Sequence, residues 1–208
     1  MRVNKLKRSG RVGPPSEPTP LSPPLDDAEL SERLAQGDRW AQEAVYRKYV
    51  QVVWGLALRL MGNRADAEDV VQDTFAEALR DAGQMRDRRM LRGWLMGVTV
   101  HQAHRRFRKR RLLQKLGLDR GERTHMLDEQ AGRSLDPELA TDLRKLGQRL
   151  EQLPPRRRIA WCLRYMEGCS LEEVAQYCAC SLATAKREIS AAHATLRDVL
   201  DIEEASDV

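Results

Sequence analysis

The sequence has few aromatic residues, few cysteines and no long apolar run. Aromatic residues make up 5 % of its 208 residues, and charged residues make up 32 %. This composition favours helical bundles with modest cores over a sheet protein. No stretch approaches the roughly 20 consecutive apolar residues of a membrane-spanning helix, and the N-terminal residues lack the apolar core of a signal peptide. We therefore expect a cytoplasmic protein with no membrane span.

Motifs for catalysis and cofactor binding are also missing. The sequence has no Gly-rich phosphate loop, no HExxH motif and no motif around a nucleophilic Ser or Cys. His101 and His104 share a helix face, but they lie in a cationic segment that would repel a metal ion. We expect no enzyme activity, no catalytic residue, no metal and no cofactor.

The four cysteines all lie in the C-terminal third of the chain, at positions 162, 169, 178 and 180. Their spacing does not match the paired Cys-x2-4-Cys ligands of structural zinc sites. Cys162 and Cys178 occupy apolar helix positions, where cysteine behaves as a small hydrophobic residue. Core packing is the favoured interpretation, and a thiol switch remains an alternative.

The positive charge is concentrated in one segment. The whole chain carries +5, whereas Met90–Lys115 carries +8 without an acidic residue, so the remainder carries −3. Such a segment is typical of a surface that contacts nucleic acid phosphates, and its aromatic side chains could stack on unpaired bases. A solvated basic helix end is the alternative, with Trp94 packed in the core beside Leu91 and Leu95.

A second segment, Asn63–Arg80, is expected to form a helix with one apolar and one acidic face. The predicted core face consists of Val70, Val71, Phe75, Ala78 and Leu79. Asp66 follows the expected cap at Asn63, where the helix dipole favours a carboxylate, so it needs no partner. Asp69 and Asp73 are four residues apart and repel each other. This pattern indicates a cationic protein surface as the target, with a plain solvated face as the alternative.

The C-terminal third predicts a helix-turn-helix. Pro155 suits the first turn of a helix that Gly168 ends. Ser170 and Glu173 form a capping box for a short helix, and Ser181 caps a longer one. The second helix would read DNA, and a helical hairpin that does not contact DNA is the alternative.

Together these patterns predict an all-α protein with two small helical domains and a flexible linker. The expected parts are a disordered basic and Pro-rich tail (1–24), a helical domain (25–115), a linker (116–137), a helix-turn-helix domain (138–203) and a short tail (204–208).

Three blocks in order resemble the extracytoplasmic-function sigma factors of bacterial RNA polymerase. The blocks are YRKYVQVVWGLALRLMGNRADAEDVVQDTFAEALR, LRGWLMGVTVHQAHRRFRKRR and LEQLPPRRRIAWCLRYMEGCSLEEVAQYCACSLATAKREI. The resemblance covers roughly residues 28–201. It implies a protein that binds core polymerase, directs it to specific promoters and assists melting without performing chemistry.

The resemblance also implies roles for particular residues. The polymerase contact, a coiled coil of the β′ subunit in the family, would involve Asp66, Asp69, Gln72 and Asp73. The minus-ten promoter element would be contacted by Arg92, Trp94, His101, Arg105, Arg106, Arg108 and Lys109. The minus-thirty-five element would be contacted by Thr184, Lys186, Arg187 and Ser190. The implied partners are core RNA polymerase through its β′ and β subunits, promoter DNA, and the anti-sigma factor that members of the family commonly have.

The sequence departs from the family pattern at several of these places. Leu91 stands where the family usually has Phe, so the preferred base at the minus-ten element cannot be read from the sequence. Glu188 stands where an arginine is common, which makes the recognition helix sparse in positive charge. Ala179 stands where the turn commonly has glycine. A left-handed alanine costs about 1 kcal/mol, so we expect a reshaped turn.

Two other functions fit the sequence. One is a helix-turn-helix repressor that acts as a dimer and does not contact polymerase. The other is a thiol-based redox sensor that binds DNA.

Overall fold

The computed structural model describes residues 26–85, 87–117 and 137–200, and every regular element in these ranges is helical. The elements are α1 (Asp27–Ala35), α2 (Arg39–Met61), α3 (Arg64–Asp81), η1 (Ala82–Gln84), α4 (Leu91–Lys115), α6 (Pro137–Gln152), α7 (Pro155–Trp161), η2 (Cys162–Met166), α8 (Leu171–Tyr177) and α9 (Leu182–Leu200). The predicted all-α fold is confirmed. Both predicted tails and most of the predicted linker lie outside the described residues.

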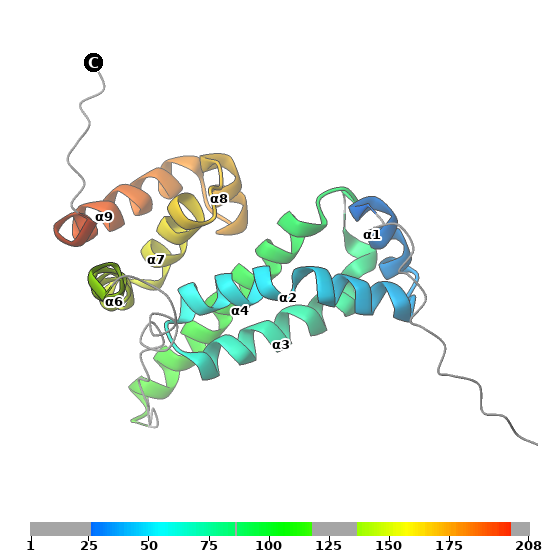
Figure 1. The fold of residues 1–208 in the computed structure, drawn as a ribbon, viewed down its shortest axis with the longest axis horizontal. Coiled ribbons are helices and arrows are strands. Elements are labelled where there is room, and N and C mark those ends of the chain that lie inside the picture. Colours follow the sequence, from blue (N-terminus) through cyan, green and yellow to red (C-terminus); the bar gives the residue numbers. More distant parts are fainter. Residues whose placement is uncertain (1–25, 86, 118–136, 201–208) are drawn as a thin grey trace, which may run out of the picture.

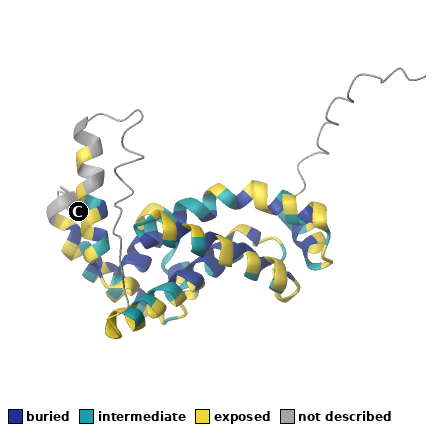
Figure 2. Ribbon diagram, turned by 90° about the horizontal axis from the view of Figure 1, so that it is seen from below, coloured by how far each residue is buried: buried dark blue, intermediate teal, exposed yellow. Residues whose placement is uncertain are grey.

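Helices α1 to α4 form the first bundle, in which α2, α3 and α4 pack against one another (Figure 1). Buried residues line the inner faces of these helices, shown in dark blue in Figure 2. The predicted core face of α3 is buried at Val70, Val71, Phe75 and Ala78. Leu79 is the exception, with 38 % of its surface exposed. On the helix it lies about 100° from Ala78 and so at the edge of the core face.

The start of α3 is fixed by a side-chain cap. Asn63 Oδ1 accepts a hydrogen bond from the Asp66 backbone N–H at 2.9 Å, as the sequence predicts. Two buried threonines, Thr74 and Thr99, donate their hydroxyl protons to the carbonyls four residues earlier, both at 2.7 Å. These bonds satisfy polar atoms in the core, so neither hydroxyl needs a partner from another helix.

Helices α6 to α9 form the second bundle. Gly168 takes a left-handed conformation (φ +69°) after the π-helical turn η2. The predicted capping box follows: the Glu173 N–H donates to Ser170 Oγ at 3.1 Å, and the Ser170 N–H donates to Glu173 Oε2 at 2.7 Å. Ser181 caps α9 by accepting from the Thr184 N–H at 3.2 Å. Helices α8 and α9 therefore form the predicted helix-turn-helix.

The turn between α8 and α9 is not reshaped, contrary to the expectation from Ala179. This residue adopts φ +48°, in the left-handed region. Two backbone bonds hold the turn, from the Ala179 N–H to the Gln176 carbonyl (3.1 Å) and from the Cys180 N–H to the Ala175 carbonyl (2.9 Å). The two hydrogen bonds offset the strain of the left-handed alanine, because they satisfy backbone carbonyls at the C-terminal end of α8.

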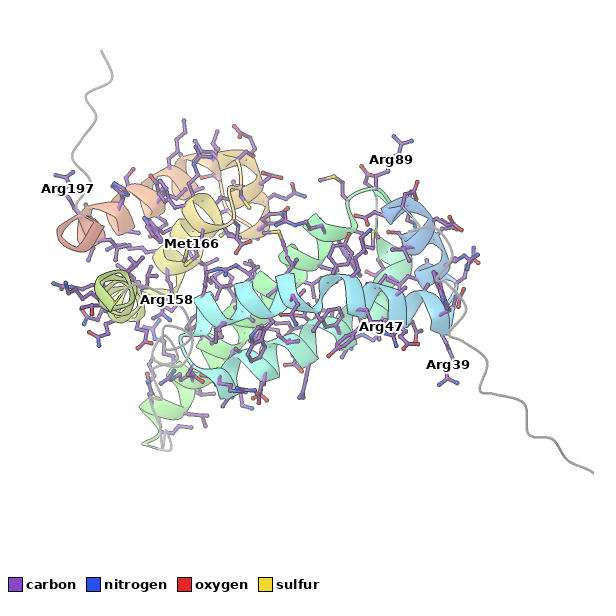
Figure 3. All side chains as sticks on the ribbon, viewed as in Figure 1. Arg39, Arg47, Arg89, Arg158, Met166 and Arg197 are labelled. Atoms are coloured by element: carbon purple, nitrogen blue, oxygen red, sulfur yellow. The ribbon has the colours of Figure 1, made fainter. Side chains whose placement is uncertain are left out.

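The two bundles contact each other through α4, which packs against α7 and α8 (Figure 1). Arg158 of α7 is 5 % exposed and donates from Nη1 to the Leu60 carbonyl of α2 at 3.0 Å (Figure 3). Its guanidinium carbon lies 5.5 Å from the ring centroid of Phe107. Close by, the Glu167 carboxylate is bonded to Arg59. The described domains thus share one buried core rather than standing apart.

Tyr177 of α8 lies directly over two glycines of α4. A methyl group at Gly93 would stand 2.9 Å from the Tyr177 hydroxyl, and one at Gly97 would stand 3.5 Å from its ring. Any larger side chain at Gly93 would therefore have to displace Tyr177.

Candidate acidic and cationic binding surfaces

Two acidic side chains near the start of α3, Asp66 and Asp69, bond to α4. Arg106 Nη2 lies 2.6 Å from Asp66 Oδ1, and Arg106 Nη1 lies 2.6 Å from Asp69 Oδ2. Arg110 Nη1 adds a longer contact to Asp66 Oδ2 at 3.5 Å. Two residues predicted to contact a protein and one predicted to contact DNA are thus bonded to each other.

The environment of Asp66 favours its charged form. Burial raises the pKa of this carboxyl, but hydrogen bonds from Asn63 and Arg106 outweigh that effect and leave the pKa below its ordinary value. The pKa of Arg106 is raised, because Asp66 and Asp69 outweigh the effect of its burial. Contrary to the sequence-based view that Asp66 needs no partner, it is the centre of an ion-pair network.

The acidic face that remains on α3 is smaller than predicted. Gln72 and Asp73 are exposed, and neither has an ion-pair partner in the described part of the chain. Asp69 is intermediate, since 48 % of its side chain is exposed despite its bond to Arg106. A partner protein can therefore reach Gln72 and Asp73 directly, and Asp69 from one side.

A cationic stripe runs along the exposed side of α4. His101, Arg105 and Arg108 recur at helical spacing, and all three are exposed together with Lys109. Trp94 lies two turns before His101 on the same side and is half-buried against the core. Arg105 has one weak acidic neighbour, Glu77, at 3.8 Å. An aromatic edge followed by arginines suits a single strand of nucleic acid.

Arg92, at the start of α4, belongs to the contact between the bundles. Its Nη2 lies 3.8 Å from Glu167 Oε2, and half of its side chain (52 %) is exposed. The Glu167 side chain is only 6 % exposed. Arg92 and Arg59 therefore share the Glu167 carboxylate where the two bundles are in contact, an arrangement called closed below. DNA would have to compete with this carboxylate for Arg92.

The candidate recognition helix α9 presents few charged groups. Lys186, Arg187 and Ser190 are exposed, and the Arg187 side chain is 73 % exposed. Thr184 is half-buried, with its hydroxyl oxygen 2.9 Å from Ser181 Oγ. Glu188 turns toward α7 and pairs with Arg157 at 3.4 Å, so it serves the packing of the bundle.

Three of the four cysteines are in environments that disfavour thiolate. Burial raises the pKa of Cys162 to about 12, of Cys169 to about 11 and of Cys178 to about 12. Because the thiolate is the reactive form, these three thiols are poor candidates for a redox switch. Among the described residues, no group of three or more His, Cys, Asp or Glu side chains could hold a metal ion.

Sequence reasoning missed the residues that join the bundles, Arg59, Arg158 and Glu167. Arg59 and Glu167 are 108 positions apart along the chain, and no local pattern pairs residues at that separation. One signal was present in the sequence. Three successive arginines follow Pro155 directly before an apolar run, so one of them could be buried, and a buried arginine requires partners. No helix in the described ranges is long and apolar enough to cross a membrane.

Each of the two bundles matches the model of a known protein family. Residues 45–112 match the model of sigma-70 region 2, and residues 143–196 match that of sigma-70 region 4. The first range contains α3 and nearly all of α4, and the second contains the helix-turn-helix. The two matches together span more than half of the chain.

Known proteins of similar sequence are sigma factors. The chain is 27 % identical over 169 residues to the RNA polymerase sigma-H factor of Pseudomonas aeruginosa, covering 78 % of this chain and 88 % of that protein. It is 29 % identical over 174 residues to the ECF RNA polymerase sigma-E factor of Haemophilus influenzae, covering 79 % and 90 %. It is 32 % identical over 173 residues to the ECF factor SigE of Mycolicibacterium smegmatis, covering 80 % and 65 %.

Two solved structures share the fold. The sigma factor RpoE of Bartonella quintana, in complex with the anti-sigma factor NepR, aligns with a TM-score of 0.61 and 24 % identity over 76 % of this chain and 95 % of that one. CnrH, in complex with the cytosolic domain of CnrY, aligns with a TM-score of 0.59 and 20 % identity over 84 % and 97 %.

Proposed function

The chain belongs to the extracytoplasmic-function group of sigma-70 factors, which act with core RNA polymerase in transcription initiation, and we propose that two surfaces of its first bundle divide this work. The exposed acidic face of α3, centred on Gln72 and Asp73, contacts the β′ subunit. The cationic stripe of α4 contacts the minus-ten element.

The observation that carries this proposal is the opposite sign of the two exposed surfaces. Asp73 has no cationic partner among the described residues, whereas Arg108 has no acidic one. The Asp66–Arg106 network lies between them and ties α3 to α4. One rigid domain therefore presents an acidic face for a protein and a basic face for DNA, which is the arrangement that a bridge between polymerase and promoter requires.

Helix α9 completes the proposal. Thr184, Lys186, Arg187 and Ser190 would contact the minus-thirty-five element, with the two cations mainly bonding phosphates because so few polar side chains surround them. Asp66, Asp69 and Arg106 support the surfaces by fixing α3 against α4, and Arg92 reaches DNA only when Glu167 releases it.

Further partners and the location of the protein follow from the same proposal. The second bundle would contact the β subunit, and the protein would work in the cytoplasm, where polymerase and promoter DNA meet. RpoE is held by the anti-sigma factor NepR in its solved structure. We propose that an anti-sigma factor likewise covers the exposed faces of α3 and α4.

A charge reversal tests the polymerase contact. The double variant Gln72→Arg, Asp73→Arg should lose co-purification with core polymerase, because repulsion replaces attraction at a cost of several kcal/mol at a desolvated contact. Both positions are exposed, so the helix content measured by circular dichroism should stay unchanged. The matched control is Glu29→Arg on α1, also exposed and outside the region 2 match. Core binding by the double variant at the level of the control would exclude this surface.

A further inference from the structure

An open cleft lies where α4, the end of α6 and the start of α7 meet. Its volume is about 1210 Å³. Arginines from both bundles line it: Arg108, Arg110 and Arg111 from α4, and Arg156, Arg157 and Arg158 from α7. Glu151 and Glu188 are the acidic residues among its lining side chains. Figure 3 shows Arg158 on this side of the molecule, at the end of α2.

Three of these six arginines already form ion pairs or hydrogen bonds within the protein. Arg110 lies 3.5 Å from Asp66, Arg157 lies 3.4 Å from Glu188, and Arg158 donates to backbone carbonyls. Arg108, Arg111 and Arg156 are exposed and have no acidic partner among the described residues. The cleft therefore holds an uncompensated positive charge that comes from both bundles.

The cleft wall also contains nitrogen atoms without partners. His104 Nε2 and Arg158 Nε are buried, and neither has a hydrogen-bond partner in the described structure. Burial, together with the charges of Arg156 and Arg108, lowers the pKa of His104. Unpaired buried nitrogens and excess positive charge thus coincide at one place, and the exposed positive charge attracts anions.

We propose that this cleft binds a chain of linked phosphate groups, either a free polyphosphate or a nucleic acid backbone, which bridges Arg111 of α4 and Arg156 of α7. Like charges on the two bundles repel each other across the cleft when no ligand is present. A polyanion between them removes this repulsion and so stabilises the closed arrangement. Arg111 and Arg156 belong to neither promoter surface proposed above.

Phosphates fit this site better than carboxylates of an acidic peptide. The guanidinium fork donates two parallel hydrogen bonds to a phosphate, and arginine is over-represented wherever such planar recognition matters. The unpaired arginines are distributed over two helices, so a ligand must carry several linked charges to reach them together. A single phosphate ion would meet only part of the site.

The binding test titrates tripolyphosphate into the full chain and measures the affinity by isothermal titration calorimetry at fixed salt. Arg111→Ala and Arg156→Ala should each weaken binding about tenfold, which is about 1.4 kcal/mol, because each loses charge-assisted hydrogen bonds to the phosphates. The double variant should lose less than the product of the two single effects, because a ligand that no longer bridges gains little from the remaining arginine. The matched control, Arg39→Ala with Arg47→Ala, removes the same charge from the exposed far end of α2 (Figure 3) and should leave binding unchanged.

Domain closure supplies the second measurement. Tripolyphosphate should reduce the radius of gyration in small-angle X-ray scattering for the wild type and the control, and should not do so for Arg156→Ala. A parallel titration with a short oligothymidylate distinguishes the two ligands. Tighter binding of tripolyphosphate identifies free polyphosphate, and tighter binding of the oligothymidylate identifies a nucleic acid backbone. Equal weakening in the control variant, or an oligoglutamate peptide that binds as tightly as tripolyphosphate, would overturn the proposal. No polymerase is present, so the outcome is independent of the co-purification test.

Discussion

At the scale of single residues, Ala179 has the least expected conformation. It has a positive φ, and in the described part of the chain no other non-glycine residue does. The strain of a left-handed L-residue is about 1–2 kcal/mol. It is retained because the bonds of Ala179 and Cys180 close the helix-turn-helix turn.

Replacing Ala179 by glycine should therefore stabilise the protein. Glycine removes the strain but gains freedom in the unfolded chain, which leaves a net gain of about 0.5–1 kcal/mol. Urea unfolding followed by circular dichroism measures it. Ala183→Gly, in the exposed first turn of α9, is the control and should destabilise by up to about 1 kcal/mol. If Ala179→Gly lowers stability as well, the turn is not strained.

At the scale of elements, the pairing of α3 with α4 rests on the carboxylate of Asp66. Its folded pKa lies below the ordinary value of 3.8. A depressed folded pKa means that the unfolded chain takes up the proton first as the pH falls. The stabilisation is therefore present in full above pH about 4 and is lost as the pH falls through the folded pKa.

Replacing Asp66 by Asn should cost about 1–3 kcal/mol at pH 7, since it removes hydrogen bonds to charged groups. It should also flatten the decline of stability below pH about 4. Urea unfolding across a pH series measures both effects. Asp73→Asn is the control, because this residue is exposed and has no ion-pair partner in the described ranges. An acid profile that stays unchanged in Asp66→Asn would contradict the assigned role.

The elements also show which features of the structure can be predicted from the sequence. The caps at Asn63, Ser170 and Ser181 were predictable because each joins residues three apart in the chain. The pairing of Arg106 with Asp66 joins residues 40 apart, and it depends on how α3 and α4 cross. Sequence therefore predicted the helices, the fold class and the charged segments, but not which acidic and basic residues bond to each other.

At the scale of the whole molecule, one carboxylate joins the two bundles in addition to their shared apolar core. Glu167 lies beside Arg59 of α2 and Arg92 of α4, and its side chain is 6 % exposed. Removing its charge would leave two arginines facing each other near a neutral amide. The closed arrangement should then lose stability relative to an open one.

Glu167→Gln should increase the radius of gyration in small-angle scattering without altering helix content. Arg92 would also be released, so affinity for single-stranded DNA should rise severalfold, because one more cation can bond a phosphate. The control is Glu172→Gln on α8, which makes the same chemical change at an exposed position. An unchanged radius would show that apolar packing alone holds the bundles together.

The pairing of Arg106 and Arg110 with Asp66 has one more consequence, which concerns the ions around DNA. Each phosphate that a protein cation neutralises releases condensed counterions, and this release drives much of the association. Because Arg106 and Arg110 are held by a carboxylate of their own chain, they release few of these ions. The formal charge of +8 on Met90–Lys115 thus overstates the entropy that DNA binding can gain from this segment.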